Sequence, residues 1–166
     1  MAESPFLRTP LAEGERFADR TAELARLDEC WKTPGSALVL YGPRRMGKSA
    51  LLAEAARRLR QHGRAVVVVD LATAVDAPDA VRRLLTAVRD GVGHTWRSLM
   101  QSVAAKLRLS LTLTPNPDGT GLPGLSLSFD QAAPASQLFT DALVAVNDEL
   151  VKRRMHLALG IDEFQR

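Results

Sequence analysis

Three short stretches of the chain are hydrophobic at almost every position. They lie at 37–41, 65–70 and 157–161, and valine, leucine, isoleucine and alanine dominate them. Continuous apolar runs of this length are typical of strands that are buried on both faces, as in a parallel sheet. We therefore expect three buried strands at these positions.

Elsewhere the apolar positions recur every three or four residues, which is the spacing of an amphipathic helix. This spacing predicts helices over 21–31, 47–61, 78–90, 94–108 and 135–154. Thr21 is the expected N-cap of the first helix, and Gly63 is expected to end the second. Strands that are separated by helices favour an α/β domain with a mostly parallel sheet.

The segment 109–129 changes to a period of two. Leucines alternate with serine or threonine over 109–114, and leucine and phenylalanine alternate with serine over 125–129. A Pro- and Gly-rich stretch separates the two runs. This arrangement predicts a β-hairpin with a long turn, added to the α/β core.

Composition mainly excludes classes of protein and kinds of site. The chain has 166 residues, of which 46% are hydrophobic and 25% charged, with a net charge of +3; this is typical of one globular domain. Cys30 is the only cysteine, so neither an intrachain disulfide nor a cysteine metal cage can form. The N-terminus lacks a signal-peptide pattern, and no apolar run could span a membrane. We expect a soluble, cytoplasmic protein without a membrane partner.

The residues that follow the first apolar run fit the phosphate-binding pattern G-x-x-x-x-G-K-[ST] at every fixed position. They are Gly42, Pro43, Arg44, Arg45, Met46, Gly47, Lys48 and Ser49. Glycines let the backbone curl so that its N–H groups face the phosphates, and the helix that follows presents its positive end to the same anion. Lys48 would reach the β- and γ-phosphates, the Ser49 hydroxyl would bind Mg²⁺, and the contact would extend to Ala50. Arg44 and Arg45 either face solvent or add attraction for the triphosphate.

Such a loop needs a carboxylate at the end of a neighbouring strand to hold Mg²⁺, through one or two water molecules. Asp70 and Asp162 both end an apolar run. We assign the metal to Asp162, because Glu163 follows it and is placed to act as the general base on an attacking water. Asp70 is interpreted as a residue that caps a turn at its strand end.

These motifs, together with Phe17-Ala18-Asp19-Arg20 and Glu23-Leu24, resemble the archaeal-type ATPases, a P-loop clade that is related to the AAA+ and STAND ATPases. The resemblance extends from about Arg16 to Gln165. It implies a three-layer P-loop NTPase fold of the ASCE type, with ATP rather than GTP as the nucleotide. It also implies that Phe17 and Arg20 lie near the adenine, so that residues 1–20 form a lead-in that contributes to the pocket.

The sheet order that the resemblance implies is 5-1-4-3-2, and the Asp-Glu pair ends strand 3. Residues 21–166 supply only strands 1, 2 and 3, so strands 4 and 5 are absent, together with the arginine finger and the helical lid. We therefore expect an incomplete ATPase domain that is the N-terminal part of a larger protein.

The leading hypothesis is an ATP- and Mg²⁺-binding module of an ATPase that couples hydrolysis to a conformational change. Positioning and charge neutralisation dominate phosphoryl transfer, and without an arginine finger this chain is expected to bind ATP with little turnover. One alternative is a STAND-type signalling switch. Another is a nucleic-acid motor that uses the basic residues of 82–108. Expected partners are ATP or ADP, a second copy, or the C-terminal remainder of the parent protein.

Overall fold

Two of the three apolar runs form neighbouring parallel strands at the centre of the molecule. In the computed structural model, β1 (Val66–Asp70) pairs with β4 (Ala158–Asp162) in a register that runs from Val66 opposite Ala158 to Asp70 opposite Asp162. The structure describes residues 20–43, 45–114, 124–129 and 135–163 of the chain. Because the strands are parallel and in register, their two aspartates end at the same edge of the sheet.

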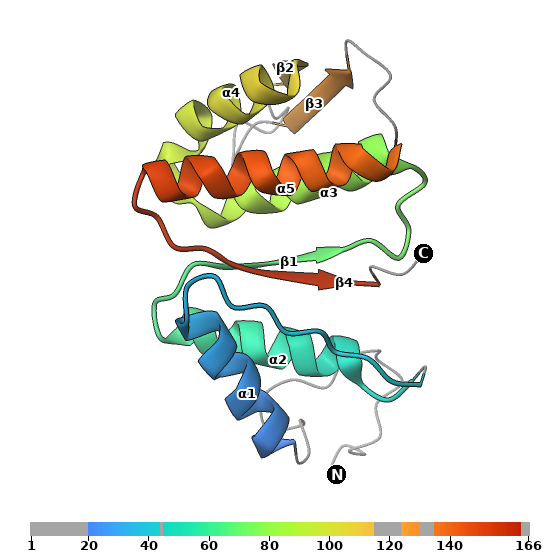
Figure 1. The fold of residues 1–166 in the computed structure, drawn as a ribbon, viewed down its shortest axis with the longest axis vertical. Helices are drawn as coiled ribbons and strands as arrows, with labels where there is room; N and C mark the ends of the chain where they lie inside the picture. The colour runs from blue at the N-terminus through green and yellow to red at the C-terminus, as the bar shows by residue number, and fades with distance from the viewer. Residues whose placement is uncertain (1–19, 44, 115–123, 130–134, 164–166) are drawn as a thin grey trace, which may run out of the picture.

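Helices cover both faces of this strand pair (Figure 1). On one face lie α1 (Thr21–Lys32) and α2 (Lys48–Gln61), and on the other lie α3 (Ala77–Gly91) and α5 (Ala135–Lys152). The result is the three-layer α/β arrangement that alternating strands and helices predict. Among the described residues, no helix combines the length and the hydrophobicity needed to cross a membrane.

A further layer lies beyond α3 and α5 (Figure 1). It consists of α4 (Trp96–Leu107), which a short 3-10 turn at Gly93–Thr95 precedes, and of the strands β2 (Leu109–Thr114) and β3 (Gly124–Phe129). The two strands pair antiparallel, with Leu109 opposite Phe129. The Ser and Thr positions with described side chains are exposed, whereas Leu109 is buried. The period-two pattern thus predicted both strands of the hairpin.

The main hydrophobic core lies between the sheet and α3, α4 and α5. Its completely buried side chains come from α3, α4 and α5 and are Val81, Leu84, Leu85, Val88, Leu99, Met100, Val103 and Ala142. Large apolar residues at helical spacing on α3 make this possible. A smaller cluster joins α1 to α2 through Leu24, Leu27, Leu51 and Ala55.

The predicted strand at 37–41 is not formed. These residues pair with none of the described strands, and the side chains of Val39 and Tyr41 are 77% and 87% exposed. Only Leu40 packs inward, against the cluster between α1 and α2. An apolar run becomes a buried strand only when a neighbouring strand satisfies its N–H and C=O groups. The prediction from hydrophobicity was therefore wrong for 37–41.

Helix boundaries differ from the sequence prediction by a residue or two, as is usual at helix ends. Thr21 is not the N-cap of α1: Arg20 takes that position, and its carbonyl accepts a hydrogen bond from the Leu24 amide at 3.0 Å. At α3 the N-cap is Asp76, which accepts a hydrogen bond from the Asp79 amide at 2.7 Å. This side-chain cap explains why α3 begins at Ala77.

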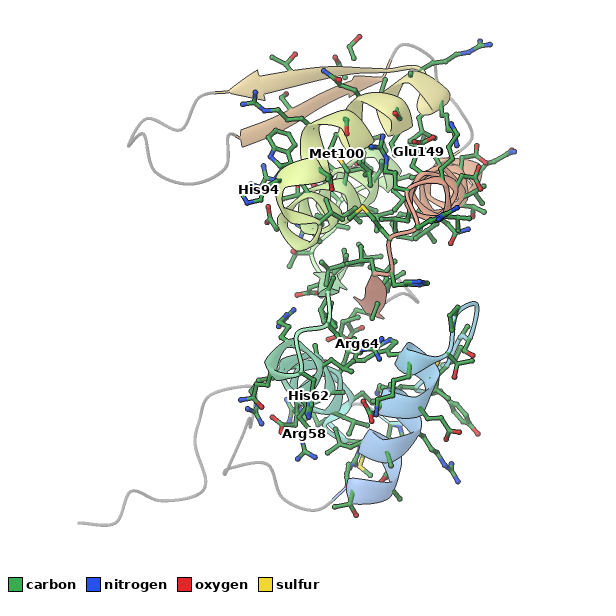
Figure 2. All side chains as sticks on the ribbon, turned by 90° about the vertical axis from the view of Figure 1, so that its left-hand side faces the viewer. Arg58, His62, Arg64, His94, Met100 and Glu149 are labelled. Carbon is green, nitrogen blue, oxygen red and sulfur yellow. The ribbon has the colours of Figure 1, made fainter. Side chains whose placement is uncertain are left out.

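A buried carboxylate joins α4 to α5. Glu149 of α5 is only 3% exposed and lies 3.2 Å from Lys106 of α4 and 3.5 Å from Arg153 (Figure 2). The Arg153 guanidinium also donates to the Ser98 and Ser102 hydroxyls of α4, at 2.8 and 3.2 Å. A charged group this deeply buried is tolerated because it is paired and hydrogen-bonded.

Candidate functional site

The glycine-rich loop leads directly into α2. Gly47 is the N-cap of α2, with φ 71° and ψ 24°, and this left-handed conformation suits glycine. No side chain among the described residues caps this helix end, and its first turn contains no acidic residue. The first N–H groups of the helix and its positive dipole end are therefore left for an anion to satisfy.

Lys48 folds back over the loop that precedes it. Its Nζ donates to the carbonyl oxygens of Gly42 and Pro43, at 2.9 Å each. The ammonium group therefore lies against the loop. Ser49 and Ala50 are half-buried beside it in the first turn of α2.

A close contact between α2 and β4 sets the position of this helix end. A Cβ built on Gly160 would lie 2.9 Å from Leu52 Cδ1, so the leucine packs against the bare strand backbone. Lys48 is four residues before Leu52, about 6 Å along the helix, and Asp162 is two residues after Gly160, about 7 Å along the strand. Figure 1 shows α2 running opposite to β4, so these two distances extend toward the same end of the molecule.

Three carboxylates lie at the edge of the sheet where β1 and β4 end. Asp70 Oδ1 accepts the Ala72 amide at 2.7 Å, which confirms that Asp70 caps the turn after β1. Asp162 Oδ1 accepts the amide of Glu163 at 3.0 Å. Glu163 is exposed and has φ 54°, an uncommon value for a residue with a side chain. The backbone therefore turns sharply at Glu163, directly after the strand.

Arg83 of α3 contributes to the edge of the sheet where β1 ends, although no sequence pattern predicts a role for it there. Its guanidinium donates to the carbonyl oxygens of Asp70 and Thr73, at 3.4 and 3.1 Å, and its Nε donates to Asp79 at 2.9 Å. The two arginine bonds to Asp79, from Arg83 and then from Arg82, hold the pKa of that carboxyl below its ordinary value. Arg83 thus ties the turn after β1 to α3, a connection that sequence spacing alone does not reveal.

The other residues that we predict to contact the nucleotide differ in their exposure, and the structure does not describe all of them. Arg45 and Met46 are exposed on the loop, and Arg45 has φ 64°. Arg20 is half-buried at the start of α1. Phe17 and Arg44 lie outside the described residues. The proximity of Phe17 and Arg20 to an adenine therefore stays a prediction.

The donor set at this end suits Mg²⁺. Hydroxyl and carboxylate oxygens, the side-chain donors of Ser49 and Asp162, are the ligands that Mg²⁺ prefers, and it commonly completes its shell with phosphate oxygens and water. Within the described part of the chain, no three His, Cys, Asp or Glu side chains come together as a cage.

Comparison with known proteins identifies the family of the chain. Residues 17–166 match the model of a family described as an ATPase domain predominantly from Archaea. Comparisons with curated proteins and with solved structures gave no match. The family match spans the glycine-rich loop, both central strands and the terminal Asp-Glu pair. The chain therefore belongs to the family of ATPase domains that occur predominantly in Archaea.

Proposed function

We propose that the chain binds ATP with Mg²⁺ at residues 42–50, as a module of an ATPase that couples hydrolysis to a conformational change. The observation that carries this proposal is the start of α2. This helix end follows a glycine loop, has no side-chain cap and no acid in its first turn, and has a lysine ammonium folded over the loop. Such an end is suited to a polyphosphate.

Each side chain would have a separate task. Lys48 would leave the carbonyls of Gly42 and Pro43 and transfer its ammonium to the β- and γ-phosphates. Ser49 and Asp162 would hold Mg²⁺, which supplies neutralisation of phosphate charge when it is bound. Glu163 would accept the proton of a water that attacks the γ-phosphate.

The contact between Leu52 and Gly160 supports the coupling part of the proposal. Lys48 and Ser49 begin the same helix that packs on β4, and β4 ends at Asp162. A shift of α2 on phosphate binding would press on β4 because closely packed interiors transmit displacement. Such a shift would connect the phosphate loop to the Asp-Glu pair through a single packing contact.

The nucleic-acid alternative has weak support, because most basic residues of 82–108 already bind carboxylates. Arg82 and Arg83 pair with Asp79, and Lys106 pairs with Asp148 and Glu149. Arg89 pairs with its neighbour Asp90. A groove that binds phosphates along a nucleic acid needs cations that are available to it.

Calorimetric titration with Mg·ATP tests the proposal. We expect Lys48→Ala to weaken binding by about 100-fold or more, because the variant loses charge-assisted contacts to the phosphates. Lys32→Ala is the matched control, since Lys32 is an exposed lysine in a surface pair with Asp28. Equal affinity of Lys48→Ala and the unmodified chain would overturn the site assignment.

A further inference from the structure

A groove of about 460 Å³ lies between α1 and the C-terminal half of α2. Its apolar lining includes Leu24 and Ala25 from α1 and Ala55 and Leu59 from α2. Two of these residues are alanines, and their small side chains leave space between the facing helices. The volume is within the range of small-ligand sites, about 300–1,000 Å³.

One end of the groove is basic. Arg58, His62 and Arg64 line it and lie together around the C-terminal end of α2 (Figure 2). Asp28 also lines the groove, but Lys32 pairs with it. The lining therefore has an excess of positive charge at the end where α2 stops.

The basic side chains are held in place to different degrees. Arg58 Nε donates to Glu54 Oε1 at 2.7 Å, and His62 Nδ1 donates to the Arg58 carbonyl at 2.7 Å. This bond places the hydrogen on Nδ1 and leaves Nε2 for another partner. Arg64 is exposed, and its guanidinium has no hydrogen-bond or ion-pair partner among the described residues. A cation beside an apolar wall is suited to a ligand that supplies both a negative charge and a hydrophobic body.

We propose that this groove binds a small amphiphilic anion. The apolar body would lie against Leu24, Ala25, Ala55 and Leu59, and a carboxylate or phosphate head would meet Arg64, with Arg58 and His62 beside it. The site is separate from the phosphate loop, because α2 has 14 residues and is therefore about 21 Å long, with the loop at its other end. The inference therefore does not depend on the phosphate contacts of Lys48.

The test uses octanoate and octyl phosphate as probes, each below its micelle concentration, with octan-1-ol and octylammonium as the uncharged and cationic comparisons. Amide chemical shifts of the full chain are followed by NMR during titration. We expect saturable shifts at Ala25, Ala55 and His62 with both anions, and at least tenfold weaker binding of the other two probes. The stronger of the two anions identifies the preferred head group.

Two variants at exposed positions make the test specific. Arg64→Glu should weaken anion binding at least tenfold, and Ala25→Trp should abolish it by filling the groove. Arg26→Glu, on an exposed residue of α1 that does not line the groove, should bind like the unmodified chain. Lys48→Ala should also bind the anions normally, which separates this inference from the ATP proposal. Octanol or octylammonium binding as tightly as octanoate, or unchanged binding by Arg64→Glu, would overturn it.

Discussion

Leu52 of α2 packs against Gly160 of β4 so closely that a side chain of one carbon at position 160 would meet three leucine atoms, at 2.9, 3.3 and 3.4 Å. The leucine is itself buried, with 7% of its surface exposed. A side chain at position 160 would therefore force Leu52 to move. This contact fixes how far the start of α2 extends beside the end of β4.

Replacing Gly160 by alanine should destabilise the chain by about 1–3 kcal/mol, because overpacking forces neighbouring side chains to move. Chemical denaturation measures the change in the free energy of unfolding. We also expect weaker Mg·ATP binding, since α2 would be displaced from β4.

A double-mutant cycle with Leu52→Ala provides the control. In the Leu52→Ala background the space beside residue 160 is open, so the cost of Gly160→Ala should fall close to zero. If the alanine costs the same in both backgrounds, the contact with Leu52 is not what requires glycine.

Glu163→Gln should retain Mg·ATP affinity and lose about 10²–10⁴-fold in the rate of hydrolysis, because glutamine keeps the size of the side chain but accepts no proton. Rates are best measured in a single turnover with protein in excess, since this chain is expected to turn over slowly. Asp70→Asn is the matched control: Asp70 ends the neighbouring strand but caps a turn. An equal loss of rate in both variants would contradict the role of Glu163.

Local signals predicted most of the architecture, whereas the roles of the site residues stay predictions. The glycine-lysine-serine spacing located the start of α2 to within a residue, and the alternation of leucine and serine located the hairpin. Asp70 caps the turn after β1, as predicted, and the assignment of the metal to Asp162 stays a prediction. These features depend on a few consecutive residues, which a sequence displays directly.

Features that depend on distant partners were not predictable in this way. Hydrophobicity marked 37–41 as a buried strand, but burial depends on a neighbour that the run itself does not encode. The bonds from Arg83 to the turn after β1 join residues that are 10 and 13 positions apart. The groove between α1 and α2 likewise results from how two helices cross.

Val39→Ser tests the finding that residues 37–41 do not form a buried strand. Val39 is 77% exposed, so its replacement should change the free energy of unfolding by less than about 0.5 kcal/mol. Val69→Ser on β1 is the buried counterpart and should cost about 1.5–3 kcal/mol, since Val69 is 2% exposed. A loss at Val39 as large as that at Val69 would mean that 37–41 is buried in solution.

Glu149 should make stability depend on pH in the acid range. Burial alone would raise the pKa of this carboxyl, but the hydrogen bond from Lys106 and the charges of Lys152 and Lys106 outweigh it, so the pKa lies below its ordinary value of 4.5. A carboxyl with a lowered pKa stabilises the folded state above its unfolded pKa, and this contribution is lost as pH falls through the folded pKa. Glu149→Gln should therefore be less stable than the unmodified chain near neutral pH.

The difference in free energy of unfolding between the unmodified chain and Glu149→Gln should stay constant down to about pH 5 and shrink as pH falls below about 4.5. Denaturant unfolding across a pH series measures this difference. Asp148→Asn is the matched control, because Asp148 also contacts Lys106 at 3.2 Å but its side chain is 54% exposed. Solvent screening makes that surface pair weak, so its removal should have little effect at any pH. If the difference in free energy of unfolding for Glu149→Gln instead widens toward acid, burial rather than Lys106 and Lys152 determines the pKa of Glu149.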